Sequence, residues 1–187
     1  MLLGVLLTLQ PWHEDATREA KADREARLAT IANAIAIATN AATCAGASDE
    51  CEPAWSRSAD DHALALVTLG WWESRFARHV HADRCRVLIG ECDAGRAKSV
   101  WQLQWSRLVP FKEWSVIGGL SRERTTRAAT AASRVFTMAF NRCKTYEGAF
   151  ALYGTGKTCK MKSAKERAKF FVRLRETAKE IREKGGE

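Results

Sequence analysis

Glu73 lies in the stretch GWWESRF, residues 70–76, between a pair of tryptophans and Arg75. The sequence places it near the C-terminal end of a predicted helix. There the helix dipole and burial against an indole ring both favour a neutral carboxyl group over a carboxylate. A neutral carboxyl group is what a general acid needs near neutral pH. The alternative is an exposed glutamate that pairs with Arg75 or Arg78.

Two later stretches also place polar residues among apolar residues and glycines: GRAKSVWQLQ at 95–104 and GAFALYGTG at 148–156. Together with WESRF, they resemble the three motifs of soluble lytic transglycosylases of the lysozyme superfamily. The resemblance covers about residues 60–160 and keeps the family's order. Each motif is weak alone, and three in order are more specific.

The individual matches differ in quality. Glu73-Ser74 matches the family's Glu-Ser pair, which an aromatic residue follows two positions later. The run SVWQ at 99–102 loosely matches a Gly-Leu-Met-Gln-like run, and LYGTG at 152–156 matches an Ala-Tyr-Asn-x-Gly-like turn. Ser99 stands where the family usually has glycine, Gly154 stands where it has asparagine, and the proline that often follows the second motif is missing. These departures concern substrate contacts more than the reaction, because the glutamate and Tyr153 are both present.

The resemblance implies cleavage of the β-1,4 bond between N-acetylmuramic acid and N-acetylglucosamine in peptidoglycan glycan strands. One catalytic residue, Glu73, would replace the two carboxylates of most glycosidases. It would protonate the glycosidic oxygen while the substrate's N-acetyl group stabilises the charge at C1. It would then take the proton of the C6 hydroxyl, which closes a 1,6-anhydro ring. No metal or other cofactor is needed. The residues implied in substrate binding are Ser74, Trp101, Gln102, Tyr153 and Gly154.

A hydrolytic lysozyme is the first alternative, and it requires a second carboxylate to activate water. Asp83, Glu91 and Asp93 lie in the segment expected to form one wall of the cleft. Asp93 is the first candidate, because it lies between the first two motifs beside Gly95.

Among the seven tryptophans, most are expected in the core. The candidates for stacking on sugar rings are Trp101, Trp105 and Trp114.

A second alternative is a non-enzymatic basic helical module that binds nucleic acid or a membrane surface. The net charge is +8, and residues 157–187 contain eleven Lys/Arg against five Glu. A basic end favours an anionic partner, whether nucleic acid, anionic lipid or the carboxylate-bearing cell wall. This alternative gives no reason for Glu73, Gln102 and Tyr153 to converge. Disulfides are also unusual in a cytosolic binder, so no nucleic acid is expected as a partner.

The elements that must position these residues are mainly helical. Periodicity and capping patterns predict helices at 15–43, 58–75, 121–143, 147–153 and from Ser163 onward, the fourth stopping at Gly154. Glycines, cysteines and short β-branched runs predict a small β-hairpin or irregular lobe at 77–105. The length of 187 residues and 46% hydrophobic content predict one lysozyme-like, mainly α domain stapled by disulfides. Residues 1–57 would supply an apolar segment and a long helix, and residues 58–187 would form the transglycosylase-like unit.

The six cysteines form three close pairs in the sequence: Cys44/Cys51, Cys85/Cys92 and Cys143/Cys159. An even number in such pairs predicts three local disulfides and an oxidising, extracytoplasmic setting. The competing interpretation is a zinc site, because His79 and His81 lie near the second pair. The tight Cys-x-x-Cys spacing of structural zinc sites is missing, however.

The first nine residues, MLLGVLLTL, are apolar like the central region of a signal peptide but have no basic residues before them. As a helix, nine residues are too short to span a bilayer. We therefore expect this segment to be retained, either buried or as a docking tail for a membrane or partner. An apolar N-terminus without a usual signal peptide, on a single catalytic domain, favours a phage particle or lysis component. A conjugation or secretion apparatus is the next choice. Its structural partner would dock through residues 1–9.

Overall fold

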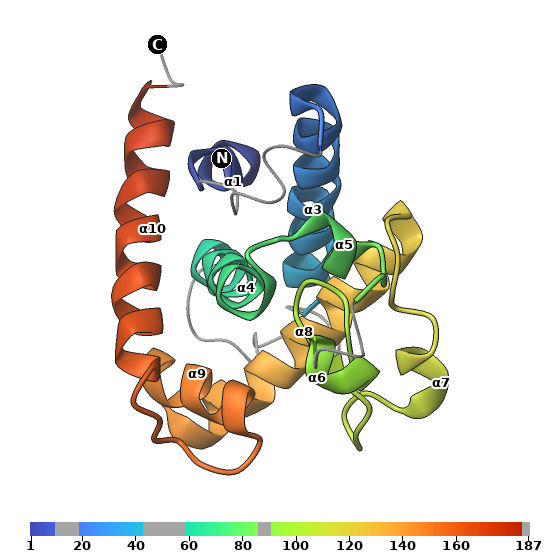
Figure 1. Ribbon diagram of the computed structural model, residues 1–187. Helices are drawn as coiled ribbons and strands as arrows, with labels where there is room; N and C mark the ends of the chain where they lie inside the picture. Colours follow the sequence, from blue (N-terminus) through green and yellow to red (C-terminus); the bar gives the residue numbers. More distant parts are fainter. Residues whose placement is uncertain (10–18, 43–58, 86–90, 185–187) are drawn as a thin grey trace, which may run out of the picture.

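The computed structural model describes residues 1–9, 19–42, 59–85 and 91–184, and 72% of them are helical (Figure 1). The helices are α1 (Leu2–Thr8), α3 (Lys21–Ala42), α4 (Ala59–Ser74), α5 (Arg78–His81), α6 (Glu91–Gly95), α7 (Phe111–Trp114), α8 (Arg122–Cys143), α9 (Tyr146–Thr155) and α10 (Ala164–Lys184). An antiparallel hairpin pairs β1 (Ala97–Lys98) with β2 (Leu103–Gln104), so that Ala97 faces Gln104. The mainly α fold with a small hairpin was predicted from the sequence.

Helix α4 lies at the centre of the molecule, as its dense apolar sequence predicts. All ten residues from Asp61 to Gly70 are buried. Figure 1 shows α4 nearly end-on, with α10 on one side and α3 on the other, while α8 runs diagonally below it. A helix that is apolar on every face must be covered on every face. This burial fixes the position of the residues at its C-terminal end, which include Glu73.

Local signals set the ends of the later helices. Ser121 caps α8, because its Oγ accepts a hydrogen bond from the backbone N–H of Arg124 at 3.3 Å. Helix α9 differs from its prediction, since it continues through Gly154 and ends at Gly156. Gly156 adopts the left-handed conformation with φ of 67°, which glycine adopts without steric cost. The C-terminal end of α9 therefore lies two residues later than predicted.

Two of the three predicted disulfides are present, Cys85–Cys92 and Cys143–Cys159. The third pair, Cys44 and Cys51, lies outside the described residues. Because Cys85 and Cys92 are bonded to each other, the zinc interpretation of this region is not supported. Within the described ranges, no cluster of three or more His, Cys, Asp or Glu residues is arranged to hold a metal ion.

Helix α1 packs into the core that the other helices share. Val5 and Leu6 are fully buried, and Gly4 lies so close to α10 that a Cβ there would be 3.3 Å from Ile181. The expectation of a buried N-terminal segment is confirmed for this face of α1. Its other face leaves Met1, Leu3 and Leu7 36–40% exposed. Among the described helices, none is long and apolar enough to cross a membrane.

Candidate active site

Glu73 is paired with Arg167 of α10. One carboxylate oxygen lies 2.5 Å from Nη1 of Arg167, and the two side chains are only 19% and 11% exposed. Arg75, one of the two partners considered from the sequence, instead lies over the ring of Trp71 at 4.7 Å. A guanidinium group therefore lies directly against the carboxyl group of Glu73. The environment of the free protein therefore differs from the purely apolar one that the sequence predicts for a general acid.

Two buried N–H groups beside this ion pair are unsatisfied. Nε1 of Trp72 and Nε of Arg167 are both buried, and neither has a hydrogen-bond partner among the described residues. The guanidinium carbon of Arg167 lies 5.8 Å from the centre of the Trp72 ring. Buried donors without acceptors are costly and uncommon. An oxygen-rich ligand that approaches Glu73 would supply the missing acceptors.

Tyr153 of α9 belongs to the same group of side chains. Its hydroxyl donates a hydrogen bond to the backbone carbonyl of Trp101 at 2.9 Å. Burial raises the pKa of Tyr153 well above its ordinary value, the negative charge of Glu73 raises it further, and Arg167 opposes both effects. Tyr153 is therefore a neutral phenol whose single proton is already used. Its oxygen can only accept a further hydrogen bond, and a protonated Glu73 or a substrate group could provide one.

Gly154 packs against Arg167 and Met161. A Cβ at this position would lie 3.5 and 3.6 Å from the two terminal guanidinium nitrogens and 3.2 Å from the methyl carbon of Met161. The sequence assigned Gly154 to substrate binding, at a position where the related motif has asparagine. In the structure its lack of a side chain leaves space beside the Glu73 ion pair.

The second motif forms a tight turn, and its side chains hold the turn together. Trp101 is completely buried and its Nε1 donates to the carbonyl of Leu66 at 3.0 Å, so its ring is not available to stack on a sugar. Gln102 donates to the carbonyl of Ser99 at 3.0 Å. Ser99 has φ of 64°, which explains why glycine suits this position, and its Oγ accepts from the N–H of Trp101 at 3.3 Å. The contribution of this motif to the site is the Trp101 carbonyl.

The hydroxyl of Ser74 also forms hydrogen bonds with backbone groups. Its hydroxyl donates to the carbonyl of Gly70 at 2.9 Å and accepts from the N–H of Phe76 at 3.1 Å. Arg75 and Phe76 both have positive φ, which is a strained conformation for residues with side chains. The ring of Phe76 packs where a Cβ on Gly70 would lie. These contacts stabilise the turn that directly follows Glu73.

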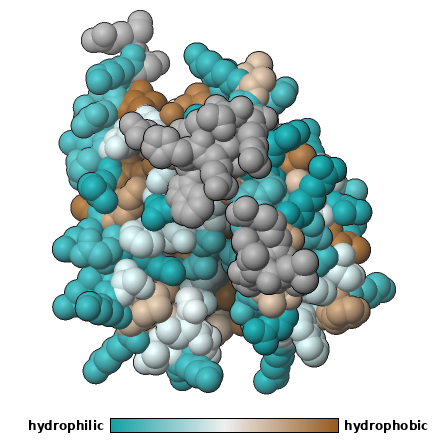
Figure 2. All heavy atoms as spheres, in the orientation of Figure 1, coloured by the Kyte–Doolittle hydropathy of each residue, from teal (hydrophilic) through white to brown (hydrophobic). Residues whose placement is uncertain are grey.

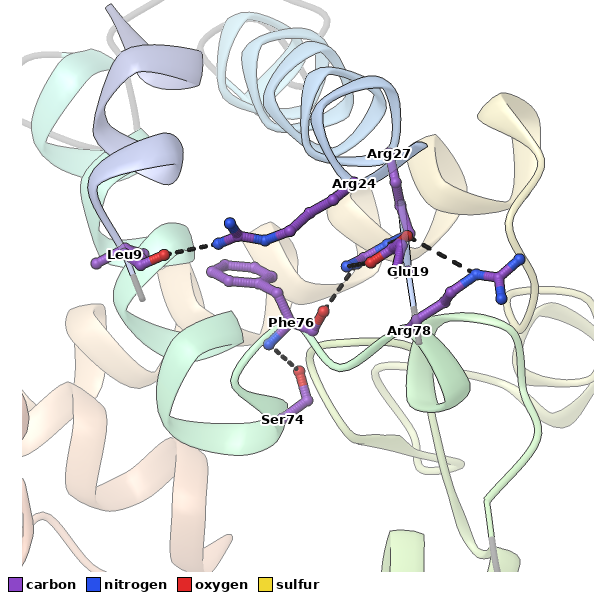
Figure 3. Close-up of polar contacts among 7 residues, drawn as sticks. All are labelled: Leu9, Glu19, Arg24, Arg27, Ser74, Phe76 and Arg78. Atoms are coloured by element: carbon purple, nitrogen blue, oxygen red, sulfur yellow. Dashed lines mark hydrogen bonds and ion pairs between the residues drawn. The ribbon is translucent and has the colours of Figure 1, made fainter. Parts of the chain in front are cut away.

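A buried ion pair ties this turn to the start of α3, as Figure 3 shows. Arg27 makes two hydrogen bonds of 2.8 Å to Glu19 and a third of 2.7 Å to the carbonyl of Phe76. The side chains of Glu19 and Arg27 are 2% and 8% exposed, and Nε of Arg78 lies 3.7 Å from Glu19. Burial raises the pKa of Glu19, but the hydrogen bond and charge of Arg27 with the charges of Arg78 and Arg24 lower it overall. Sequence reasoning missed this network, since nothing local marks Phe76 as the partner of Arg27.

The three carboxylates considered for a hydrolytic mechanism each have partners in the lobe. Asp93 accepts from Arg96 at 3.0 Å and from Gln104 at 2.6 Å. Asp83 pairs with Lys98 at 2.9 Å, and Glu91 lies 3.5 Å from His79. Of the two other tryptophans considered for sugar stacking, Trp105 is 61% exposed, and its ring meets that of Phe111 edge to face. Nε1 of Trp114 donates to the carbonyl of Leu103.

The two buried histidines are structural. His81 is 1% exposed, and its Nε2 lies 2.8 Å from the hydroxyl of Thr125. Burial lowers the pKa of both His62 and His81 to about 4. Both rings are therefore neutral at neutral pH.

The site thus joins Glu73 of α4, Tyr153 of α9, Arg167 of α10 and the carbonyl of Trp101. The chemistry that these residues permit is proton transfer by the carboxyl group of Glu73, which has the guanidinium group of Arg167 and the phenol of Tyr153 as neighbours. A scan against protein-family models gave no match, and searches of curated proteins and of solved structures gave none either.

Proposed function

We propose that this protein cleaves peptidoglycan glycan strands as a lytic transglycosylase, with Glu73 as its single acid–base group. The observation that carries the proposal is that two motifs far apart in the sequence meet at Arg167, which pairs with Glu73 and lies against Gly154, the residue after Tyr153. The second motif contacts Tyr153 through the Trp101 carbonyl, which accepts the hydrogen bond of its hydroxyl. A helical module that only binds a polyanion would have no need for this convergence.

In this proposal Arg167 is the side-chain partner of Glu73 before and after proton transfer. Glu73 acts as the protonated acid, so its ion pair with Arg167 must first open. The glycan strand separates the two side chains and satisfies the buried N–H groups of Trp72 and Arg167. Tyr153 then accepts a hydrogen bond from the protonated carboxyl group, which holds its proton in the site.

The bond changes then follow in two steps. Glu73 gives its proton to the glycosidic oxygen as the C1–O bond breaks, and Arg167 pairs again with the carboxylate that this step leaves. The C6 hydroxyl attacks C1 from the same sugar and returns its proton to Glu73. An intramolecular nucleophile has a large advantage over water, because it is already tethered to the reacting carbon. One water-free cycle therefore regenerates the acid and leaves a 1,6-anhydro end.

A hydrolytic lysozyme remains the second candidate, with Asp93 as the carboxylate that activates water. Its side chain is 45% exposed, but it would have to leave Arg96 and Gln104 to reach a sugar. The setting we propose is extracytoplasmic, in agreement with the two disulfides. A phage particle or secretion apparatus would bind the exposed face of α1, which presents Met1, Leu3 and Leu7.

Replacing Glu73 with glutamine tests the function. The Glu73→Gln variant keeps the shape of the side chain but loses its titratable proton, so the loss of turbidity of purified cell walls should stop. A positioned acid contributes about 10²–10⁴ in rate, so residual activity above about a tenth of wild type would contradict the assignment. Glu123→Gln is the matched control, because Glu123 is 73% exposed on α8 and should be dispensable.

A further inference from the structure

The Cys143–Cys159 disulfide brings two basic segments of the chain together. Arg142 and Lys144 flank Cys143 at the end of α8, and Lys160 follows Cys159. The Cα atoms of the two cysteines are 5.6 Å apart, so these cations occupy one region of the surface. Further cations lie in the same loop and in the first turn of α10. We call the whole set the basic ridge: Arg142, Lys144, Lys157, Lys160, Lys162 and Lys165, all of them exposed.

The charges of the basic ridge are not compensated. In the part of the chain that the structure describes, no carboxylate forms a salt bridge with any of its six members. The cations farther along α10 differ, since Arg175 pairs with Asp61 at 2.9 Å and Arg182 pairs with Asp60. Within residues 157–165 there are four lysines and no acidic residue. The basic ridge is therefore a concentrated positive surface that attracts anions.

The basic ridge borders the candidate active site. Its loop begins after Gly154 and Gly156 and leads into α10, whose first turns carry Arg167, the partner of Glu73. In the middle of the loop, Met161 lies against Gly154. Figure 1 shows this loop between α9 and α10 at the lower left, and teal and pale residues predominate there in Figure 2. A polymer bound along the basic ridge would therefore lie next to the segment that carries Arg167, the partner of Glu73.

The loop is held in one conformation before any ligand binds. The hydroxyl of Thr155 accepts hydrogen bonds from the N–H groups of Lys157 and Thr158 at 3.3 and 3.2 Å. The hydroxyl of Thr158 accepts another from the N–H of Lys160 at 3.2 Å. Together with the disulfide, these bonds fix the backbone that presents the lysines. A surface that is already ordered loses less entropy when it binds.

We propose that the basic ridge binds the carboxylates of the peptides attached to peptidoglycan, and so draws the glycan strand toward Glu73. This proposal rests on the proposed function, and it names the anionic group that the protein recognises beside the scissile bond. A single-stranded nucleic acid would favour aromatic side chains among the cations, for its bases to stack on. No large exposed hydrophobic or aromatic side chain occurs between Met138 and Val172 in this described stretch.

Binding to insoluble cell walls tests this proposal. Every protein in the assay carries Glu73→Gln, so that the walls are bound but not cleaved. The ridge variant is Lys157→Gln with Lys160→Gln and Lys162→Gln. The control variant changes three exposed lysines elsewhere and loses the same charge: Lys21→Gln, Lys112→Gln and Lys184→Gln. In cosedimentation with walls stripped of phosphate polymers, the ridge variant should bind about tenfold more weakly, since three surface charge pairs are lost. The control variant should stay within about twofold of its parent.

Chemical changes to the wall identify the group that is bound. Amidation of the wall carboxylates should remove the difference between parent and ridge variant, and salt should weaken the parent more than the ridge variant. Equal binding by the ridge and control variants, or ridge-dependent binding that survives amidation, would overturn the proposal. Ridge-dependent retention of duplex DNA with no effect on walls would instead assign the surface to nucleic acid. Cleavage of walls by the Glu73→Gln parent would refute the proposed function, a result distinct from all of these.

Discussion

Replacing Arg27 with methionine should destabilise the protein and its active site together. Arg27 makes three hydrogen bonds, two to Glu19 and one to the carbonyl of Phe76, and both charged side chains are almost completely buried. Removing one partner of a buried ion pair costs about 3–5 kcal/mol, because the other charge stays buried. Since Arg78 remains 3.7 Å from Glu19, we expect the lower end, about 3 kcal/mol.

This loss should depend on pH in a defined direction. The pKa of Glu19 is lowered in the folded protein from its ordinary value of 4.5, so its contribution to stability is fully present above pH 4.5. The contribution disappears as the pH falls through the folded-state pKa. The difference in the free energy of unfolding between wild type and Arg27→Met should therefore be largest at neutral pH and should shrink in acid.

Urea unfolding at several pH values measures the effect. The control is Glu25→Gln on the same helix, whose partner Lys21 lies 3.9 Å away and is 91% exposed, so its effect should stay below about 1 kcal/mol. Wall cleavage by Arg27→Met should also slow, because Phe76 closes the turn that follows Glu73. If the free energy of unfolding of Arg27→Met lies within about 1 kcal/mol of the wild-type value, the buried pair does not hold this turn. The same conclusion follows if the difference between the two proteins grows in acid.

Three further predictions concern the site and its supports. Arg167→Gln should slow wall cleavage by up to roughly 10²-fold, because Glu73 loses the cation that holds its side chain in place; cleavage at the wild-type rate would show that Arg167 does not position Glu73. Tyr153→Phe should lower the free energy of unfolding by about 1–3 kcal/mol, since the Trp101 carbonyl loses its donor, and should slow cleavage more than the control Tyr146→Phe, whose hydroxyl makes no contact with that carbonyl. Changing Cys143 and Cys159 together to serine should cost about 3 kcal/mol in the same unfolding assay, and an unchanged midpoint would show that the disulfide does not restrain the unfolded chain.

The parts of the fold that local chemistry determines were predictable. Ser121 marked the start of α8, and the proximity of Cys85 to Cys92 and of Cys143 to Cys159 predicted two disulfides that the structure contains. The sequence predicts that α9 ends at Gly154, because any glycine near the end of a helix is a candidate for the residue that terminates it. The structure uses Gly156, the position at which φ is positive.

The partners of the site residues were harder to predict, because they come from distant parts of the chain. Arg167 is 94 residues from Glu73, and only packing of α10 beside α4 brings them together. Gln102 and Ser74 were expected to face the substrate, but their hydrogen bonds hold tight turns. Those turns contain non-glycine residues with positive φ, a conformation that no short motif reveals. Gly154 carried a weak signal, since its departure from the related motif coincides with its contact with Arg167.

The chemical structure of the cleaved glycan tests the central claim most directly. If Glu73 is the only acid–base group and the C6 hydroxyl is the nucleophile, digested glycan should consist of fragments lighter by one water than hydrolysis products. Mass spectrometry should then find 1,6-anhydro-N-acetylmuramic acid at the new ends, and these fragments should be absent after digestion with Glu73→Gln. Ordinary reducing ends would contradict the account and would require a second carboxylate, with Asp93→Asn as the first variant to examine.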